Sequence, residues 1–137
     1  MTGIPETVKE RRSRFGVKPT ILLVDKEEAI RELIRDMLDG QGFEIIQASD
    51  AAGALDLARR EGQKIDLLVT EAEPIGMKAQ ELTRLLYKVQ PKMRILFMAG
   101  KFDEGFAFML GDQAERLFLL KPFTRAALLQ KINGILL

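Results

Sequence analysis

The sequence of 137 residues contains neither cysteine nor histidine. Without cysteine there can be no disulfide bond, no thiolate catalysis and no cysteine-ligated zinc site. Without histidine the chain lacks the commonest metal ligand and the usual proton shuttle, and it cannot form a serine–histidine–aspartate triad. Any site chemistry therefore falls to carboxylates, lysines and hydroxyl groups, and we do not expect an enzyme.

Long apolar runs and a strong charge of one sign are lacking as well. No run approaches the ~20 apolar residues that span a bilayer, and residues 1–18 contain no hydrophobic signal core, so we expect a cytoplasmic protein without membrane contact. Lysine and arginine number 21 against 20 acidic residues, and a net charge of +1 argues against a dedicated nucleic-acid-binding protein. The length and the 47% hydrophobic content fit a single domain.

Basic side chains are concentrated at the N-terminus. Residues 1–18 hold five basic and two acidic residues, which leaves 16 basic and 18 acidic residues in the remainder. We expect residues 1–18 to be a solvated tail or a short helix, and residues 19–137 to form the domain. The alternative is that the tail is an arm that contacts a partner or an anionic surface.

Short apolar runs rich in branched residues alternate with segments of helical spacing. The runs predict strands, and the segments predict helices with one apolar face. Gly40 and Gly42 are expected to end the first helix, Pro91 the third, and Thr124 is the expected N-cap of the last. The predicted strands are Ile21–Val24, Glu44–Gln47, Leu67–Thr70, Ile95–Met98 and Leu117–Leu120.

Four of the predicted helices carry an apolar stripe, whereas residues 101–115 form the weakest candidate. Gly105 and Gly111 interrupt this segment, and its aromatic residues keep no single face. We expect its apolar side chains Phe102, Phe106, Phe108 and Met109 to be core residues. The stripes of the other helices are Ala29, Ile30, Leu33, Ile34, Met37 and Leu38; Ala51, Ala54, Leu55 and Ala58; Leu82, Leu85, Leu86 and Val89; and Ala127, Leu128, Ile132 and Ile135.

Repeated strand–helix units predict an open, doubly wound α/β fold with a five-stranded parallel sheet covered by helices on both faces. Ligands of such sheets bind outside the carboxyl ends of the strands. The candidate functional residues therefore follow or end the strands: Asp25 and Lys26, Glu71, Ala99 and Gly100, and Lys121 with Pro122.

Four blocks at these strand ends resemble, in order and spacing, those of a response-regulator receiver domain. They read ILLVDKEEAI, DLLVTEAEPIGM, ILFMAG and FLLKPF, and the resemblance covers about residues 19–137. It implies the CheY-like, flavodoxin-like fold with strand order 2-1-3-4-5 and a role in two-component phosphorelay signalling. It also implies a magnesium site made by two acidic residues after the first strand, and an aspartate ending the third strand that accepts a phosphoryl group.

Three of the five positions that the resemblance places in the phosphorylation pocket have changed. Asp25 is kept, and so is Lys121, which contacts the phosphoryl group in the family. Lys26 replaces the second acidic residue, Glu71 stands at the phospho-acceptor position, and Ala99 replaces a serine or threonine. A fixed ammonium repels a divalent cation. We therefore expect no magnesium cofactor, with Asp25 as a residual candidate ligand, and we expect the two carboxylates to pair with the two lysines.

Two hypotheses describe the altered pocket. In the first, Lys26 takes the place of the cation and Glu71 partly imitates the phosphorylated state, since it brings one negative charge where a phosphoryl group brings ~1.5 to 2. In the second, Glu71 is a structural salt-bridge carboxylate that imitates nothing. Independently of either, a Lys26 side chain that points into solvent would leave the magnesium site weakened rather than blocked. Phe118 stands at the family's switch position, and without a hydroxyl at residue 99 we expect its coupling to the pocket to be lost. Pro74 is displaced by one residue from the family motif, which predicts a reshaped loop.

The resemblance favours a stand-alone pseudo-receiver that acts through protein contacts without phosphorylation. One alternative is a receiver that a histidine kinase still phosphorylates with non-standard or inefficient chemistry. Another is nucleotide or flavin binding, although no glycine-rich loop follows the first strand. The expected partners are other signalling proteins, among them a histidine kinase or an output protein. A homodimer is also expected, through the face formed by the fourth helix, fifth strand and fifth helix. Because the last helix ends at Leu137, either the chain acts by contact with another molecule or it is a piece of a longer protein.

Overall fold

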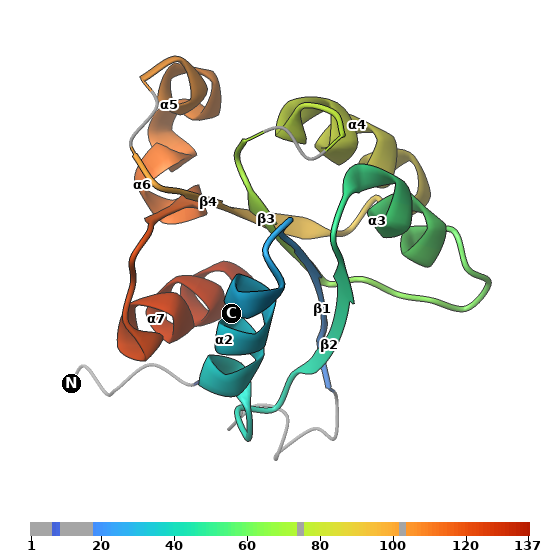
Figure 1. Cartoon of the computed structure of the whole chain (residues 1–137), viewed down its shortest axis with the longest axis horizontal. Coiled ribbons are helices and arrows are strands. Elements are labelled where there is room, and N and C mark those ends of the chain that lie inside the picture. The colour runs from blue at the N-terminus through green and yellow to red at the C-terminus, as the bar shows by residue number, and fades with distance from the viewer. Residues whose placement is uncertain (1–6, 9–17, 74–75, 102–103) are drawn as a thin grey trace.

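The computed structural model describes residues 7–8, 18–73, 76–101 and 104–137. Its centre is a five-stranded parallel sheet in the order β2-β1-β3-β4-β5, with helices on both faces (Figure 1). This architecture confirms the predicted fold and strand order. Each strand differs from its predicted bounds by at most one residue at either end. The strands are β1 (Thr20–Val24), β2 (Glu44–Ala48), β3 (Leu67–Glu71), β4 (Arg94–Ala99) and β5 (Phe118–Leu120).

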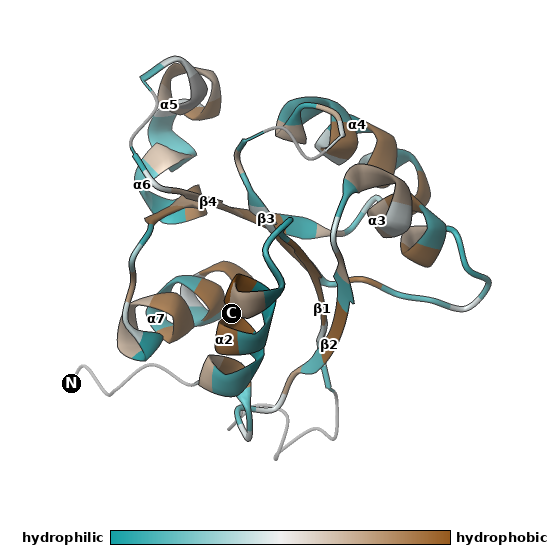
Figure 2. Cartoon of the chain, in the orientation of Figure 1, coloured by the Kyte–Doolittle hydropathy of each residue, from teal (hydrophilic) through white to brown (hydrophobic). Residues whose placement is uncertain are grey.

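Helices α2 (Glu28–Leu38) and α7 (Arg125–Leu136) pack on one face of the sheet, and α3 (Ala51–Ala58) and α4 (Ala79–Val89) pack on the other. Their apolar sides turn toward the strands (Figure 2). Side chains cap two of these helices. Asp50 accepts the main-chain N–H of Gly53 at the start of α3, and the Thr124 hydroxyl accepts the N–H of Ala127 at the start of α7, as predicted.

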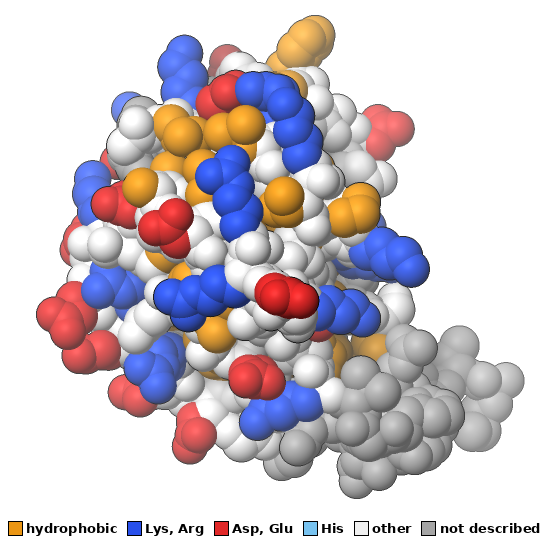
Figure 3. Space-filling view, turned by 90° about the vertical axis from the view of Figure 1, so that its right-hand side faces the viewer, with side chains coloured by type: hydrophobic (Ala, Val, Ile, Leu, Met, Phe, Trp, Pro, Cys, Tyr) orange, Lys and Arg blue, Asp and Glu red, His pale blue; other side chains and the backbone are white. Residues whose placement is uncertain are grey.

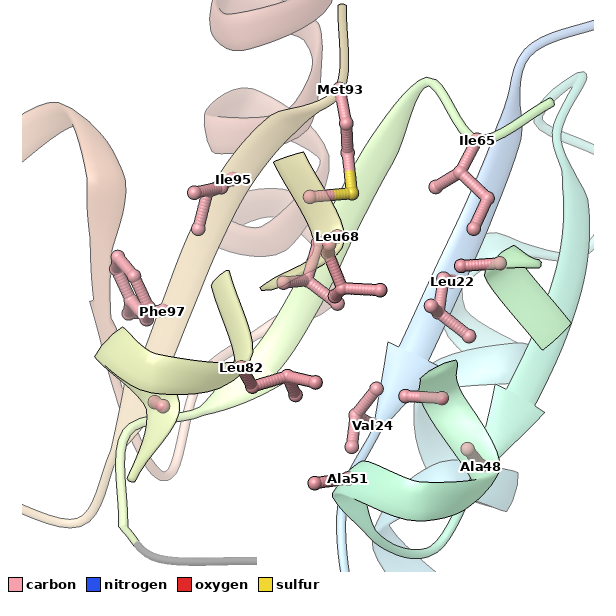
Figure 4. Packing of buried hydrophobic residues seen from close by; sticks show 14 of the residues in the cluster. Leu22, Val24, Ala48, Ala51, Ile65, Leu68, Leu82, Met93, Ile95 and Phe97 are labelled. Atoms are coloured by element: carbon pink, nitrogen blue, oxygen red, sulfur yellow. The ribbon is translucent and has the colours of Figure 1, made fainter. Parts of the chain in front are cut away.

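Two hydrophobic clusters form the core, one on each face of the sheet. Neighbouring residues of β1 alternate between them, because successive side chains of a strand point to opposite faces. Leu22 and Val24 pack with α3 and α4 (Figure 4), whereas Ile21 and Leu23 pack with α2 and α7. Every residue of β1 and β3 is buried, as expected for strands covered on both faces.

The predicted helix stripes are only partly correct. All four residues of the α3 stripe are buried. In α2, Ile34 and Leu38 are buried, but Leu33 is 48% exposed and Ala29 is also exposed. Val89, at the end of α4, is 41% exposed. The stripes of α2 and α4 are wider than the strip of helix that the sheet covers, so residues at the edge of each stripe face solvent.

The segment between β4 and β5 is the least regular part of the described chain. It contains α5 (Glu104–Leu110), a 3-10 turn (Gly111–Gln113) and α6 (Ala114–Leu117). The positive φ of 59° at Gly111 marks the break between the two helices. Because α6 runs to Leu117, β5 begins one residue later than predicted.

The expectation that the apolar residues of this segment are core residues is wrong where the structure describes them. Phe108 is 89% exposed and Met109 is 55% exposed. Of the α5 side chains that the structure describes, only Leu110, the last residue of the helix, packs against the core cluster beneath it. Phe102 and the side chain of Phe106 lie outside the described residues.

Val8 joins the N-terminal segment to the domain. Its side chain is only 3% exposed and belongs to the cluster between the sheet, α2 and α7. Its main-chain N–H donates to Oδ1 of Asn133 in α7, with a distance of 2.7 Å between the two atoms. The other residues of the expected tail, apart from Thr7 and Lys18, lie outside the described residues. Within the described ranges, no helix is long and apolar enough to cross a membrane.

Candidate functional site

The strand-end residues that the sequence singled out meet at the carboxyl edge of the sheet. Asp25 follows β1, Glu71 and Ala99 end β3 and β4, and Lys121 follows β5. They gather because parallel strands end on the same side of a sheet. A cleft of about 160 Å³ opens here, lined by residues that include Lys26, Glu71, Ala99 and Lys121. Asp25 is fully buried.

Asp25 is paired with Lys121, as expected. The Lys121 ammonium lies 2.8 Å from Oδ2 of Asp25, and the lysine side chain is 21% exposed. The other carboxylate oxygen, Oδ1, accepts the main-chain N–H of Glu27 at 2.9 Å. The main-chain carbonyl of Asp25 accepts a hydrogen bond from the Arg31 guanidinium. Both oxygens of this buried carboxylate therefore already have a donor, which offsets the cost of burying its charge.

Glu71 lies at the bottom of the cleft, with only 3% of the residue exposed. Its Oε1 accepts the main-chain N–H of Lys26, with the two atoms 3.1 Å apart. Burial raises the pKa of the Glu71 carboxyl above its usual value. The Lys26 hydrogen bond opposes this rise, the Asp25 charge adds to it, and the Lys121 charge lowers the pKa again. The acceptor-position carboxylate is thus held against the backbone at the end of β1.

The Lys26 side chain does not pair with either pocket carboxylate, so that expectation is wrong. Its ammonium lies 3.7 Å from Oε2 of Glu73, and the two side chains are 54% and 60% exposed. An exposed ion pair of this kind contributes at most about 1 kcal/mol to stability. Glu73 was not among the predicted site residues. Its position two residues after Glu71, on the loop that leaves β3, is the only signal of it in the sequence.

Ala99 and Phe118 complete the set of predicted pocket and switch residues. Ala99 is 7% exposed, and its methyl group supplies no hydroxyl to the cleft. Its carbonyl accepts the main-chain N–H of Lys121 at 2.7 Å, which ties the ends of β4 and β5 together. Phe118 is 6% exposed, lies in register with Phe97 of β4, and packs into the cluster beneath α3 and α4. Pro74 lies outside the described residues.

The residues at this site do not fit the magnesium ion that a receiver domain implies. Magnesium requires about six oxygen ligands in octahedral geometry. Both carboxylate oxygens of Asp25 already bind protein donors, and one oxygen of Glu71 accepts a main-chain N–H. The residue at position 26, which is acidic in the family pattern, is a lysine. Across the described part of the chain, no three acidic side chains form a group that could hold a metal ion.

A sequence model of the response regulator receiver domain matches residues 21–133. The chain belongs to this family. Among curated proteins, this receiver domain is 28% identical over 127 residues to the sensor kinase CckA of Brucella abortus, covering 93% of this chain and 13% of that protein. It is 32% identical over 117 residues to the alkaline phosphatase synthesis transcriptional regulatory protein PhoP of Bacillus subtilis, covering 85% of this chain and 48% of that protein. The chain thus spans less than half of each of these two relatives.

Solved receiver domains share the fold. The signal receiver domain of an HD domain-containing protein from Pseudomonas fluorescens Pf-5 has a TM-score of 0.74 and 26% identity, over 88% of this chain and 95% of that one. The chemotaxis protein CheY4 of Vibrio cholerae has a TM-score of 0.75 and 21% identity, over 88% of this chain and 100% of that one. At this identity, the likeness to CheY4 is one of fold.

Proposed function

We propose that this receiver domain of two-component signalling acts without phosphorylation and without magnesium, as a protein-interaction module. The observation that carries the proposal is the state of the acceptor position. Glu71 is buried, its carboxylate accepts the Lys26 main-chain N–H, and burial raises its pKa. A nucleophilic carboxylate must be ionised and reachable by the phosphoryl donor. Burial works against both requirements, whereas the Lys26 hydrogen bond occupies Oε1 but favours the ionised form.

The surroundings of Glu71 also lack the groups that stabilise phosphoryl transfer. The reaction needs positive charge around the transferring group, which a bound metal ion normally supplies. Lys26 stands where a metal ligand is expected, and its ammonium is directed to Glu73. Lys121, the remaining cation of the cleft, is engaged with Asp25 at 2.8 Å. Ala99 offers no hydroxyl to a phosphoryl oxygen.

The contacts of Glu71 support a structural carboxylate rather than an imitation of the phosphorylated state. If Glu71 imitated a phosphorylated aspartate, its carboxylate would face the Lys121 ammonium, because this lysine contacts the phosphoryl group in the family pattern. Among the described residues, Lys121 is instead ion-paired with Asp25, and Glu71 is bonded to main chain. We therefore propose that the pocket keeps one conformation, and that no added negative charge switches it to another.

The alternative function is a receiver that a histidine kinase still phosphorylates inefficiently. It is favoured by one observation, that Asp25 and Lys121 are kept and paired at the edge of the cleft. Magnesium separates the two functions, because an inefficient receiver needs the ion and an interaction module is indifferent to it.

Intact-mass spectrometry after incubation with acetyl phosphate and magnesium tests the proposal. A receiver with an ordinary aspartate at the acceptor position serves as the positive control. We expect no adduct on this chain under conditions that label the control. An adduct of about 80 Da would refute the proposal in favour of the alternative.

A matched variant of the same chain shows whether the loss resides in the pocket. Lys26→Asp, Glu71→Asp and Ala99→Thr together restore the family's residue types at the three changed positions. We expect this triple variant to bind magnesium and to gain the adduct. If it stays unlabelled, the loop that contains Pro74, or the wider geometry, must contribute to the loss.

The module's partners are proposed from its relatives and from one exposed surface. Receiver domains related to this one occur in a sensor kinase and in a transcriptional regulator, so a kinase or an output protein is the expected class of partner. An apolar groove of about 650 Å³ lies between α6, β5 and α7, and Leu120 beside it is 46% exposed. We propose that this face also forms a homodimer.

Light scattering coupled to size-exclusion chromatography tests the dimer. We expect the mass to exceed that of one chain at high concentration. Leu120→Glu should return it to the monomer, because a charge would be buried at the centre of an apolar contact. Leu33→Glu, which alters a comparably exposed leucine on α2, should leave the dimer intact. A monomer at all concentrations would contradict the proposal.

A further inference from the structure

A second apolar groove lies away from the strand-end cleft, between α4 and the α5–α6 segment. It has a volume of about 660 Å³ and is called here the α4–α5 groove. Ile95 and Phe97 of β4 form its floor, Tyr87 of α4 forms one wall, and Met109 and Leu110 of α5 form the other. The two helices lie on the same side of the sheet, with β4 between them (Figure 1).

The groove exists because the elements around β4 are short. Strand β5 pairs only with Phe97, Met98 and Ala99, so it covers half of the six-residue strand β4. Among its described side chains, helix α5 contributes only the partly buried Leu110 to the cluster beneath it and leaves Met109 exposed. Tyr87, on the opposite wall, is 40% exposed. Exposed apolar side chains gathered beside an apolar floor are typical of a protein-docking surface.

The charges on the groove have one sign. Three arginines line it, namely Arg84 of α4, Arg94 at the start of β4 and Arg116 of α6, and none of the lining residues is acidic. Arg84 is paired with Glu81 outside the groove. Figure 3 shows the side of the molecule that carries α3 and α4, where hydrophobic side chains lie among lysines and arginines in the upper part of the view, with acidic side chains also present there.

Arg94 and Arg116 are held in place by neutral acceptors. The Arg94 guanidinium donates to the carbonyl of Ile135 at 2.8 Å. Arg116 donates to the carbonyl of Gly134 at 3.1 Å and to the side-chain oxygen of Gln113 at 3.2 Å. Within the described residues, neither guanidinium forms an ion pair. Each therefore keeps its full charge and spare N–H donors, and it loses little side-chain entropy when it binds a carboxylate.

We propose that the α4–α5 groove binds an acidic amphipathic segment of a partner protein. The apolar floor would take the hydrophobic side chains of that segment, and the arginines would pair with its Asp or Glu residues. Charge complementarity argues against the chain's own N-terminal segment as the occupant, because residues 1–18 are basic. The proposal does not depend on the phosphorylation state, because the groove shares no lining residue with the strand-end cleft.

Selection of peptides on the full-length chain tests this proposal. A display library of random 12-residue peptides is the probe, followed by fluorescence anisotropy with the enriched peptides. We expect the enriched sequences to combine apolar residues with Asp and Glu. Their affinity should fall with rising salt concentration, as expected for binding that depends on exposed charge pairs. Enrichment of neutral or basic sequences would overturn the proposal.

A pair of variants at one residue isolates the role of charge. Met109 is exposed on the groove wall, so either Met109→Glu or Met109→Lys should leave the fold intact, which thermal unfolding can check. We expect Met109→Glu to weaken binding about tenfold or more through like-charge repulsion, and Met109→Lys to retain it. Arg60→Glu alters an exposed arginine outside the groove and should change affinity less than about twofold, because salt screens distant charges.

Four further outcomes bear on the site and on its occupant. Equal effects of Met109→Glu and Met109→Lys would contradict recognition by charge. Loss of peptide binding in Leu120→Glu, but not in Met109→Glu, would place the site on the β5 face instead. A dimer that Met109→Glu dissociates would make a second copy of the chain the occupant. Unchanged binding by the triple pocket variant would support independence from the strand-end cleft.

Discussion

At the residue scale, Glu71 differs from an aspartate at the same position by one methylene group. The added methylene group lets the carboxylate reach the main-chain N–H of Lys26 at 3.1 Å while the residue stays 3% exposed. Burial raises the pKa of this carboxyl, and the Asp25 charge adds to the rise, while the Lys26 hydrogen bond and the charges of Lys121 and Lys26 offset only part of it. The acceptor position thus holds a buried carboxylate with a raised pKa.

The raised pKa of Glu71 gives stability a pH dependence of known sign. Between the ordinary pKa of 4.5 and the higher pKa of the folded state, the folded protein keeps a proton that the unfolded chain has lost. Stability therefore falls as pH rises through this window. Glu71→Gln keeps the oxygen that accepts the Lys26 N–H and removes the titration. We expect its free energy of unfolding, relative to the parent, to increase from pH 4 to pH 8 in urea titrations.

Glu73→Gln is the matched control for this titration. Glu73 is two residues away, and its side chain is 60% exposed. Replacing the Glu73 carboxylate should change the free energy of unfolding by less than about 0.5 kcal/mol at any pH between 4 and 8, as for most surface changes. If the difference in free energy of unfolding between Glu71→Gln and the parent stays constant with pH, the Glu71 carboxylate is not desolvated.

The sequence could name the residues of the site and predict that its carboxylates pair with lysines, which holds for Asp25 and Lys121 but not for Glu71 and Lys26. Strand ends at one edge of a parallel sheet must meet, so Asp25, Glu71, Ala99 and Lys121 were predictable as neighbours. The direction of the Lys26 side chain depends on several rotatable bonds and on the loop after β3. Its contact with Glu73, and the contact of its own backbone with Glu71, could not be read from spacing.

At the element scale, one buried glutamine joins three elements on the face that carries α3 and α4. The Gln90 side chain, at the end of α4, donates to the carbonyl of Ala58 at 3.0 Å and to that of Gln63 at 2.8 Å. It accepts the main-chain N–H of Ile65 at 3.1 Å. These bonds connect the end of α3 and the loop into β3 to α4, so they fix how the two helices sit on the sheet.

Gln90→Leu is expected to lower the free energy of unfolding by about 2–4 kcal/mol. The leucine is of similar size, but it leaves main-chain groups of Ala58 and Ile65 buried without partners, and that is the costly outcome of losing a buried hydrogen bond. Urea denaturation measures the change. Gln130→Leu, at an exposed position of α7, is the control and should cost less than about 0.5 kcal/mol. Equal effects at the two positions would contradict the role of Gln90.

The spacing of apolar residues predicted the strands well, because burial against the helices largely determines which residues form them. Strands covered on both faces are short apolar runs, which is the case for β1, β3 and most of β4. The edge strands β2 and β5 are less buried, but their branched and apolar residues still placed them, and all five strands were found with bounds within one residue. Between β4 and β5, two glycines weaken the helix and the packing surface is small. The chain there forms α5, a 3-10 turn and α6, and Phe108 is left exposed. The spacing of apolar residues in this segment does not show how much sheet surface is available for them to pack against.

At the scale of the whole molecule, Val8 shows that the N-terminal segment is more than an appendage. Its side chain is buried in the cluster that α2 and α7 form with the sheet, and its N–H is bonded to Asn133, 125 residues later in the chain. The basic composition of residues 1–18 predicted a solvated tail or a short helix and gave no sign of a buried residue, because composition is averaged over the segment. One apolar residue among charged neighbours carries little weight in that average, yet a single buried contact can anchor the segment.

Val8→Ala is expected to lower the free energy of unfolding by about 1–2 kcal/mol, because two buried methyl groups leave the core and the surroundings collapse only in part. The same substitution at Val89, which is 41% exposed at the end of α4, removes little buried surface and gains helix propensity. It should be neutral or slightly stabilising. Urea denaturation of both variants compares them directly. If Val8→Ala costs no more than Val89→Ala, the N-terminal segment is not anchored in solution, and the domain's stability resides entirely in the sheet and its helices.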